Sequence, residues 1–251
     1  MSYGMYIAAE GASAQSRRLE VISNNMANVD TIGFKPEVTA FQARYSEAIQ
    51  EGQVPPGSRG LPDLGGGVKV IETRTDFSPG KLQRTGNDND VAISGDGFFQ
   101  VEHPTGETTL TRAGAMTLDP LGQLVLSGTN LPVLSAGGAP ITLNPSLPWS
   151  INSRGVVEQE GGQIPMALVR PESLDTLEKA GANLFRSPDE VYPIPAFERR
   201  VQAGFLEMSG VNSTEQLMEM IETNRAFEAN TQMIRHHDTA TGNLISRVLG
   251  A

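Results

Sequence analysis

Apolar residues recur at alternating spacings of three and four along the first thirty positions. One polar residue, Gln15, interrupts this series between positions 1 and 29. Such a heptad seam is typical of a helix that packs lengthwise against another helix. We expect the helix to end near Asp30 and Gly33, because Pro36 follows and proline cannot continue a helix. The apolar members of the seam are Met1, Met5, Ala8, Ala12, Leu19, Ile22, Met26 and Val29.

Helical spacing returns at Ser213 and continues nearly to the end of the chain. Ser213 and Gln216, three residues later, fit a capping box at the start of this second helix. Polar layers at Asn224, Thr231 and Asp238 interrupt the apolar track, a pattern that can select register between neighbouring helices. The apolar members of the track are Leu217, Met220, Phe227, Ile234, Ile245 and Val248.

Between the helical ends, short apolar runs alternate with glycine, proline, asparagine and aspartate. Over residues 68–206 this alternation predicts many short strands, arranged as an antiparallel irregular sandwich or small barrel. The sequence DPLG at 119–122 suits a type I turn. Residues 172–185 fit a brief helix that ends at Gly181. Residues 51–67 are rich in proline, glycine and polar residues, which predicts a linker or extended arm.

Taken together, these patterns predict an α+β chain whose two long terminal helices pair as a coiled-coil-like bundle. We divide it into an N-terminal helix (1–35), an extended arm (36–67), a central β domain (68–206) and a C-terminal helix (207–251). Residues 1–35 and 212–251 would together form an axial helical domain. A helix with an apolar seam and a polar back must bury that seam against a partner. The predicted assembly interface therefore consists of Ala8, Ala12, Leu19, Ile22, Met26, Val29, Leu217, Met220, Phe227, Ile234, Ile245 and Val248.

Charge and composition mainly exclude classes of function and of segment. The formal net charge of −10 argues against a nucleic-acid partner, which requires a basic face. The chain contains no cysteine, so disulfides and thiolate chemistry are excluded. No run approaches the roughly 18 apolar residues that a membrane span needs. The first residues lack the basic and apolar regions of a cleavable secretory signal, so we expect any export to follow another route.

Residue clusters that could carry chemistry are scarce. His236, His237 and Asp238 invite a metal-site reading, but adjacent helical residues point about 100° apart and do not share a face. The run NDND at 87–90 lacks the glycine and distal glutamate of a calcium loop, and turn chemistry explains it better. Trp149 is a lone aromatic that suits packing better than a sugar platform. We expect no catalytic residue, metal or cofactor, no small-molecule substrate and no enzyme activity.

Four blocks of sequence stand out by their motifs and span nearly the whole chain. They are SNNMANVDTIGFK (23–35), DVAISGDGFFQV (90–101), LTRAGAMTLDPLGQLV (110–125) and the segment 202–234. In content and order they resemble the signatures of the flagellar rod and hook proteins. One departure is Gly210, where the family usually has asparagine before the long helix. The signature residues carried over are Asn25, Ala27, Asn28, Gly33, Phe34, Gly97, Phe98, Phe99, Arg225 and Phe227.

The resemblance implies a structural subunit of the bacterial flagellum, in which terminal helices pack into concentric tubes and the β domain forms an outer layer. Its implied partners are further copies of the chain, other rod subunits and the flagellar type III export apparatus. Its implied location is the periplasm-spanning rod of the basal body, reached without a cleavable signal peptide. Phe41 and Tyr45 resemble the short aromatic export motif of such proteins, with helix packing as the alternative.

Two alternatives stay open. The chain is too short for a hook subunit and too long for the smallest rod proteins, which leaves the proximal and distal rod types. The absence of an obvious insertion between residue 48 and the first strand favours the proximal type over the distal one. A protein of a different class, an oligomeric β-domain binding module, is disfavoured because aromatic platforms are few and helical seams dominate.

Overall fold

The computed structural model describes residues 3–45, 49, 52, 55 and 65–250. The chain divides into two compact units, each assembled from segments that are distant in the sequence. Unit 1 takes residues 1–27, 37–75 and 212–251, and unit 2 takes residues 28–36 and 76–211. These boundaries differ from the expected division, because the segment 28–36 belongs with the central strands and the segment 37–75 belongs with the helices.

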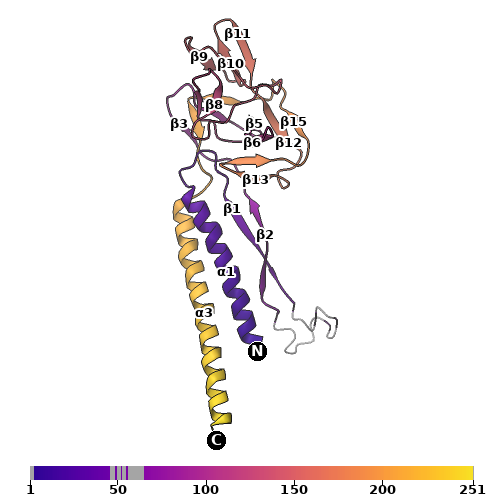
Figure 1. Ribbon diagram of the computed structural model, residues 1–251, viewed down its shortest axis with the longest axis vertical. Coiled ribbons are helices and arrows are strands. Elements are labelled where there is room, and N and C mark those ends of the chain that lie inside the picture. The colour runs from indigo at the N-terminus through magenta and orange to yellow at the C-terminus, as the bar shows by residue number, and fades with distance from the viewer. Residues whose placement is uncertain (1–2, 46–48, 50–51, 53–54, 56–64, 251) are drawn as a thin grey trace. The chain divides into compact units, whose positions relative to one another are not determined.

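Unit 1 is built on two antiparallel helices, α1 (Tyr3–Ala27) and α3 (Ser213–Leu249), which lie side by side (Figure 1). The heptad patterns therefore predicted helices correctly at both ends. The capping box at Ser213 was wrong, because Ser213 is already the first helical residue. Asn212 is the N-cap instead, and its extended backbone lets its side chain accept a hydrogen bond from the Thr214 amide over 3.2 Å.

The two helices meet through positions that repeat every seven residues on α1. Glycine occupies two of these positions, and a Cβ on Gly11 would lie 3.1 Å from the side-chain amide of Asn230. Small residues therefore let α3 approach α1 closely at this end. The facing pairs are Gly4 with His237, Gly11 with Asn230, Arg18 with Glu219, and Asn25 with Gln216.

A β-hairpin completes unit 1. Strand β1 (Glu37–Ala43) pairs antiparallel with β2 (Val68–Thr75), with an irregularity between Ala40 and Phe41. No strand was expected before residue 68, so β1 is an addition to the predicted arm. Asn25 of α1 explains part of its position: its side chain donates to the Glu37 carbonyl over 2.8 Å and accepts from the Glu37 amide over 2.9 Å.

Unit 2 is antiparallel throughout its strand pairs, as expected. A six-stranded sheet has the order β13-β14-β6-β5-β12-β15, and it ends at β13 and β15 rather than closing into a barrel. A three-stranded sheet has the order β11-β10-β9, and three further pairs are β16-β4, β17-β3 and β7-β8. The strands are β3 (Leu82–Arg84), β4 (Val91–Ile93), β5 (Phe98–Glu102), β6 (Thr108–Thr111), β7 (Met116–Leu118), β8 (Leu124–Leu126), β9 (Trp149–Ile151), β10 (Val156–Gln159), β11 (Gly162–Pro165), β12 (Leu168–Pro171), β13 (Glu178–Gly181), β14 (Leu184–Arg186), β15 (Val191–Pro193), β16 (Val201–Ala203) and β17 (Phe205–Glu207).

The centre of unit 2 lies around β5, which is buried on both faces. Successive residues of a strand point to opposite faces, so Phe98 and Phe99 enter two different clusters. Phe99 joins the larger aliphatic core, whereas Phe98 packs edge-on against Phe77 with ring centroids 5.9 Å apart. Gly97 precedes them with φ 131°, and a Cβ there would lie 2.4 Å from Cδ1 of Ile194.

Two segments of unit 2 had a predicted local structure, a turn at 119–122 and a brief helix over 172–185. The turn at 119–122 is confirmed, since the Gly122 amide donates to the Asp119 carbonyl over 3.0 Å. The brief helix over 172–185 was wrong: these residues contain the β13–β14 hairpin. Its turn residues Gly181, Ala182 and Asn183 all have positive φ, a backbone conformation that a helix does not contain.

Candidate assembly surfaces and a buried ion network

The predicted seam of α1 is only partly buried within this single chain. Ala8 and Ile22 are buried, while Ala12, Leu19 and Met26 are half-buried. The remaining predicted position, Val29, is half-buried and lies beyond the end of α1, in the segment that belongs to unit 2. The half-buried positions leave an apolar strip of α1 accessible to a further helix.

A second buried stripe on α1 was missed. It contains Ala14, Val21 and Asn25, which lie outside the predicted heptad track. The hairpin contacts this side of the helix: Arg44, just after β1, forms an ion pair with Glu10 over 2.5 Å. The signal was the accumulation of small and apolar residues at positions 7, 14 and 21, which forms a heptad series of its own.

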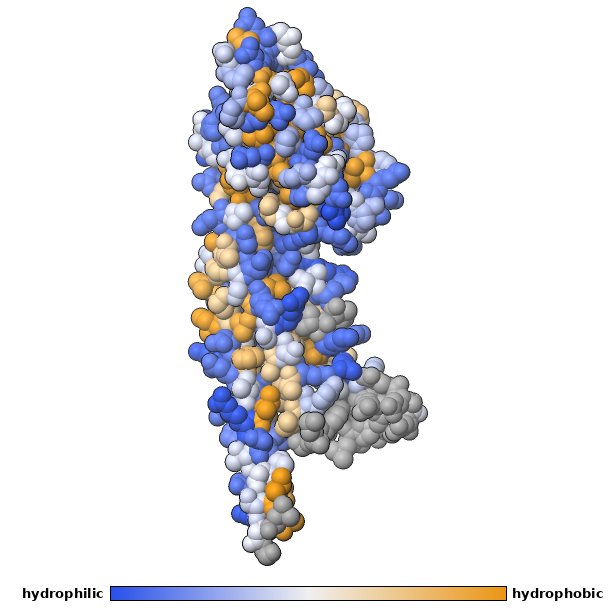
Figure 2. Space-filling model, in the orientation of Figure 1, coloured by the Kyte–Doolittle hydropathy of each residue, from blue (hydrophilic) through white to orange (hydrophobic). Residues whose placement is uncertain are grey.

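The predicted track of α3 is more exposed than that of α1. Met220, Phe227 and Ile234 are half-buried, whereas Leu217, Ile245 and Val248 are exposed. Among the residues of this helix whose burial is described, Thr223 is the buried one, and the sequence pattern did not single it out. Four further large apolar side chains of α3 are exposed, namely Met218, Ile221, Met233 and Leu244. Figure 2 shows hydrophobic side chains along the helices and near the C-terminal end of α3.

The exposure near the end of α3 follows from the register of the helix pair. Gly4, close to the start of α1, faces His237. Residues of α3 beyond this level extend past the described part of α1. Leu244 is 64% exposed and Val248 is 70% exposed for that reason. The C-terminal turns of α3 thus form an apolar helix end that no described part of the chain covers.

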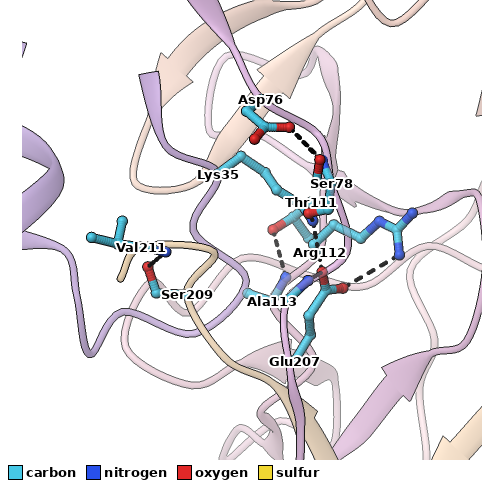
Figure 3. A network of polar contacts seen from close by, with 10 residues as sticks. Lys35, Asp76, Ser78, Thr111, Arg112, Ala113, Glu207, Ser209 and Val211 are labelled. Atoms are coloured by element: carbon cyan, nitrogen blue, oxygen red, sulfur yellow. Dashed lines mark hydrogen bonds and ion pairs between the residues drawn. The ribbon is translucent and has the colours of Figure 1, made fainter. Parts of the chain in front are cut away.

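Unit 2 contains a buried ion network centred on Glu207 (Figure 3). Lys35 donates from Nζ to Glu207 Oε1 over 2.7 Å and to the Ser78 carbonyl over 2.7 Å. The Gly80 amide donates to the same Glu207 oxygen over 2.9 Å, and Nη1 of Arg112 reaches Oε2 over 3.3 Å. One carboxylate therefore accepts hydrogen bonds from two cations and an amide in the interior, although Nε of Arg112 is buried without a partner among the described residues.

Burial lowers the pKa of both cations. Desolvation lowers the pKa of Lys35 from its ordinary value, and the hydrogen bond and charge of Glu207 act in the opposite direction. Desolvation likewise lowers the pKa of Arg112, whose guanidinium carbon lies 5.1 Å from the centre of the Phe98 ring. The carboxylate of Glu207 offsets only part of the cost of taking both positive charges out of water, because the pKa of each cation is still lowered.

The same network ties the segment 28–36 to the last strand of unit 2. The Gly33 amide donates to the Glu207 carbonyl over 2.8 Å, and the Gly210 amide donates to the Phe34 carbonyl over 3.0 Å. Gly33 has φ 68°, and a Cβ there would lie 2.7 Å from the Ala113 amide nitrogen. Gly33 and Phe34 are therefore fixed in unit 2 by backbone hydrogen bonds and close packing. Their position just after a helical seam in the sequence did not predict these contacts.

The other signature residues divide between the two units. Asn25 is buried, and Ala27 is the exposed last residue of α1. Asn28 accepts a hydrogen bond from the Thr31 hydroxyl over 3.1 Å, which shapes the chain after the helix. Arg225 of α3 is exposed and Phe227 is half-buried.

The two residues of the predicted export motif lie at the end of the hairpin. Phe41 is in β1 and is 38% exposed, and Tyr45 follows the strand and is 62% exposed. Neither residue is part of a helix, because Phe41 is in β1 and Tyr45 follows that strand. Their role in export stays a prediction.

Sites for chemistry are not apparent in the described residues. Within them, no group of three or more histidine and carboxylate side chains could hold a metal ion. His236 is exposed and His237 faces Gly4, so the two adjacent histidines point to different surroundings. Among the described helices, none is long and apolar enough to cross a membrane.

Comparisons with known proteins agree with this arrangement. Residues 5–35 match the family profile of flagella basal body rod proteins, residues 92–159 match the D1 domain of flagellar hook protein FlgE/F/G, and residues 202–247 match the C-terminal part of flagellar basal body rod FlgEFG proteins.

Relatives match over nearly their full lengths. The flagellar basal-body rod protein FlgF of Caulobacter vibrioides is 32% identical over 99% of this chain and 98% of its own length. FlgG of Bacillus subtilis is 32% identical over 98% of this chain and 99% of its own length, and FlgF of Rhizobium meliloti is 31% identical over the full length of both. This chain belongs to the family of flagellar basal-body rod proteins.

Proposed function

We propose that this chain is a non-enzymatic structural subunit of the bacterial flagellar basal-body rod, joined to other subunits through the faces of α1 and α3. The observation that carries the proposal is the row of exposed apolar side chains on α3 in a chain of this family. A free helix face of this kind costs solvation free energy in water. Burying one such side chain against a neighbour contributes about 1.5–3 kcal/mol.

The proposed interface keeps the more accessible of the predicted residues and adds one exposed residue of α3. On α1 it uses the half-buried Ala12, Leu19 and Met26, which sit beside the buried Ala8 and Ile22. On α3 it uses Leu217, Ile245 and Val248 together with the exposed Leu244. We propose that α1 and α3 form the axial helical domain with coiled-coil-like packing between subunits, and that unit 2 supplies the β domain.

Among the rod types we favour the proximal one. The support is the connection between β1 and β2, where the sequence offers no obvious inserted segment. A distal rod subunit is the alternative, since relatives named FlgF and FlgG both align over nearly their whole lengths. An oligomeric β-domain binding module finds no support in the family membership.

The proposed partners are other copies of this chain, other rod subunits and the flagellar type III export apparatus. Export without a cleavable signal would use an unfolded chain, and the exposed Phe41 and Tyr45 are the proposed recognition residues. The proposed location is the periplasm-spanning rod of the basal body.

Gene deletion with complementation tests the proposal. Deletion should stop flagellar assembly at the rod and abolish motility, and the full-length gene should restore both. A deletion strain that carries normal filaments would reject the assignment to the rod. A purified full-length chain that stays monomeric at high concentration, with both helices formed, would reject assembly through the helix faces.

A further inference from the structure

The three-stranded sheet of unit 2 carries opposite charges at its two ends. Strand β10 runs between the turn 152–155 at one end and the turn 160–161 at the other. At the first turn, Asn152 fixes the backbone because its side chain accepts from the amides of Arg154 and Val156 over 2.9 and 3.1 Å. Each end of the sheet opens into a groove.

The groove at the first end is basic. It has a volume of about 570 Å³, and arginine supplies all of its charged lining residues: Arg154, Arg199 and Arg200. Two backbone hydrogen bonds bring these segments together, from Val201 to the Ser153 carbonyl over 3.0 Å and from Ser94 to the Arg200 carbonyl over 2.8 Å. Arg154 and Arg200 are exposed and form no ion pair with any described residue.

The edge of the basic groove carries an unusually exposed aromatic ring. Phe197 is 86% exposed, the highest value among the large apolar residues for which exposure is described. Arg199 beside it is half-buried and donates to the carbonyls of Ile194 and Met166, so its guanidinium is fixed in place. Arginine and exposed aromatic residues together are the composition that protein interfaces favour.

The groove at the opposite end is acidic. It has a volume of about 590 Å³, and its charged lining residues are Glu158 and Glu160. Trp149 is half-buried on its wall, opposite Gln159 in the β9–β10 ladder. Glu160 lies at the tip of the turn and is exposed, so its carboxylate is available to a partner.

We propose that the basic groove of one copy of this chain receives the acidic β10–β11 turn of a second copy, so that unit 2 associates head to tail. The arginine-lined groove at one end and the acidic turn at the other are complementary in charge, which favours contact between unlike ends over contact between like ends. Within one copy the grooves are separated by the length of β10, about 13 Å for four residues, so they cannot fill each other.

Head-to-tail contact of two different surfaces generates an open series of subunits rather than a closed pair. The inference rests on the proposed function only in that copies of the chain must meet in an assembly. It adds a contact on the β domain to the contacts on the helices. Exposed ion pairs alone contribute little, so Phe197 and Trp149 supply the apolar part of the contact and the charges select its orientation.

Site-specific cross-linking of the full-length chain tests the proposal. Because the chain has no cysteine, Ser153→Cys labels the basic groove and Ser150→Cys labels the acidic groove, each with a near-isosteric change at an exposed position. Two preparations, one per substitution and with tags of different mass, are mixed and treated with a short bismaleimide. A cross-link specific to the mixture is expected, because only different grooves meet. Cross-links within either preparation alone at the same yield would overturn the proposal.

Charge reversal supplies the matched controls. Arg154→Glu with Arg200→Glu in the Ser153→Cys chain should lower the mixed cross-link about tenfold, since two attractions become repulsions. Glu160→Arg in the Ser150→Cys chain should then restore it, and Arg84→Glu, an exposed position on β3, should leave it unchanged. An unchanged yield after the double reversal, or no rescue by Glu160→Arg, would overturn the proposal.

The unmodified parent chain separates this inference from the proposed function. If the parent restores motility and self-associates while the mixture gives no specific cross-link, the head-to-tail contact is wrong and the rod assignment stands. If the parent fails to restore motility, the rod assignment is wrong whatever the cross-linking yields.

Discussion

Lys35 donates a hydrogen bond to Glu207 over 2.7 Å although 172 residues separate them, and each side chain is only 1% exposed. The pair joins the segment that follows α1 to the last strand of unit 2. Buried pairs are weak evidence of net stability, because desolvation offsets much of their attraction. Removing one partner is different, since the other charge is then left alone in the interior.

We therefore expect Glu207→Ala to lower the free energy of unfolding of unit 2 by about 3–5 kcal/mol, because Lys35 and Arg112 would both lose their carboxylate. Denaturant titration with Trp149 fluorescence measures this, since Trp149 is the one tryptophan and packs against the core of unit 2. Glu198→Ala is the control. Its pair with Arg170 is exposed, so the change should stay below about 1 kcal/mol. Equal effects of the two substitutions would contradict the assigned role of Glu207.

A substitution at Gly33 tests how closely the chain after α1 packs against the backbone at Arg112 and Ala113. Gly33→Ala would place a methyl group 2.7 Å from backbone atoms of Arg112 and Ala113, in addition to the cost of a positive φ. Gly86 also has a positive φ, 75°, but a Cβ there meets nothing within 4 Å. Gly86→Ala should cost about 1–2 kcal/mol for the backbone conformation alone. Gly33→Ala should cost clearly more in the same Trp149 titration, and similar costs would show that the chain after α1 is free to shift.

Asn25 fixes the hairpin of unit 1 to α1. Asn25→Ala removes two hydrogen bonds to the backbone of Glu37 and one to Gln216, at a site that is 2% exposed. We expect a local loss of about 1–3 kcal/mol, because the Glu37 amide and carbonyl lose buried partners. Hydrogen exchange of the β1 amides should accelerate accordingly. Ser23→Ala, an exposed change two residues earlier on the same helix, should leave this exchange unchanged.

The unfolding free energy of unit 2 should decrease at low pH, and Asp76 should account for part of that decrease. Hydrogen bonds from the hydroxyl and amide of Ser78 hold the pKa of this carboxyl below its ordinary value. A lowered pKa in the folded state means that the stabilisation is present above the ordinary value and is lost as the pH falls through the folded pKa. Asp76→Asn should therefore reduce the loss of stability below about pH 4.

Ser78→Ala gives a graded control for this pH dependence. It removes the hydroxyl donor but keeps the amide donor, so its acid dependence should lie between those of the parent chain and Asp76→Asn. Identical curves for all three chains would show that Asp76 does not contribute. The measurement is the unfolding free energy from Trp149 fluorescence at pH values on both sides of 4.

The helices were predictable from sequence because a heptad seam is a local pattern, and α1 and α3 follow it closely. The short strands of unit 2 were predictable as a class because turn residues separate them. Strand β1 was not, since its partner β2 lies 25 residues after it and pairing across such a distance leaves no local signal. The ion pair of Lys35 was not predictable either, because its partner Glu207 is 172 residues away in the sequence.

The burial of individual seam residues was also beyond the sequence. Apolar periodicity predicts which residues share one face of a helix, but it does not predict whether another element packs on that face. Ala8 and Ile22 are buried, whereas the similarly apolar Ile245 and Val248 are exposed. Register decides the difference, because α3 extends past the described start of α1. Thr223 is buried because it lies seven residues from both Gln216 and Asn230, which contact α1, and so shares their face of α3.

The exposed end of α3 leads to a prediction that separates assembly from folding. Replacing Leu244, Ile245 and Val248 together by serine should change the unfolding free energy by no more than about 0.5 kcal/mol per site, because these side chains contact little within the chain. The same variant should fail to restore motility in a deletion strain, since each lost apolar side chain removes about 1.5–3 kcal/mol of burial between subunits.

Thr239→Ser with Asn243→Ser is the matched control, because both residues are exposed, polar and in the same turns of α3. This control should restore motility fully. If the triple serine variant also restored motility, the C-terminal turns of α3 would not be part of the interface, and Leu217, Met218 and Ile221 near the start of the helix would be the next exposed apolar group to test. If instead the triple variant unfolded at lower denaturant, the end of α3 would be contributing to the stability of the single chain, contrary to the exposure of its side chains.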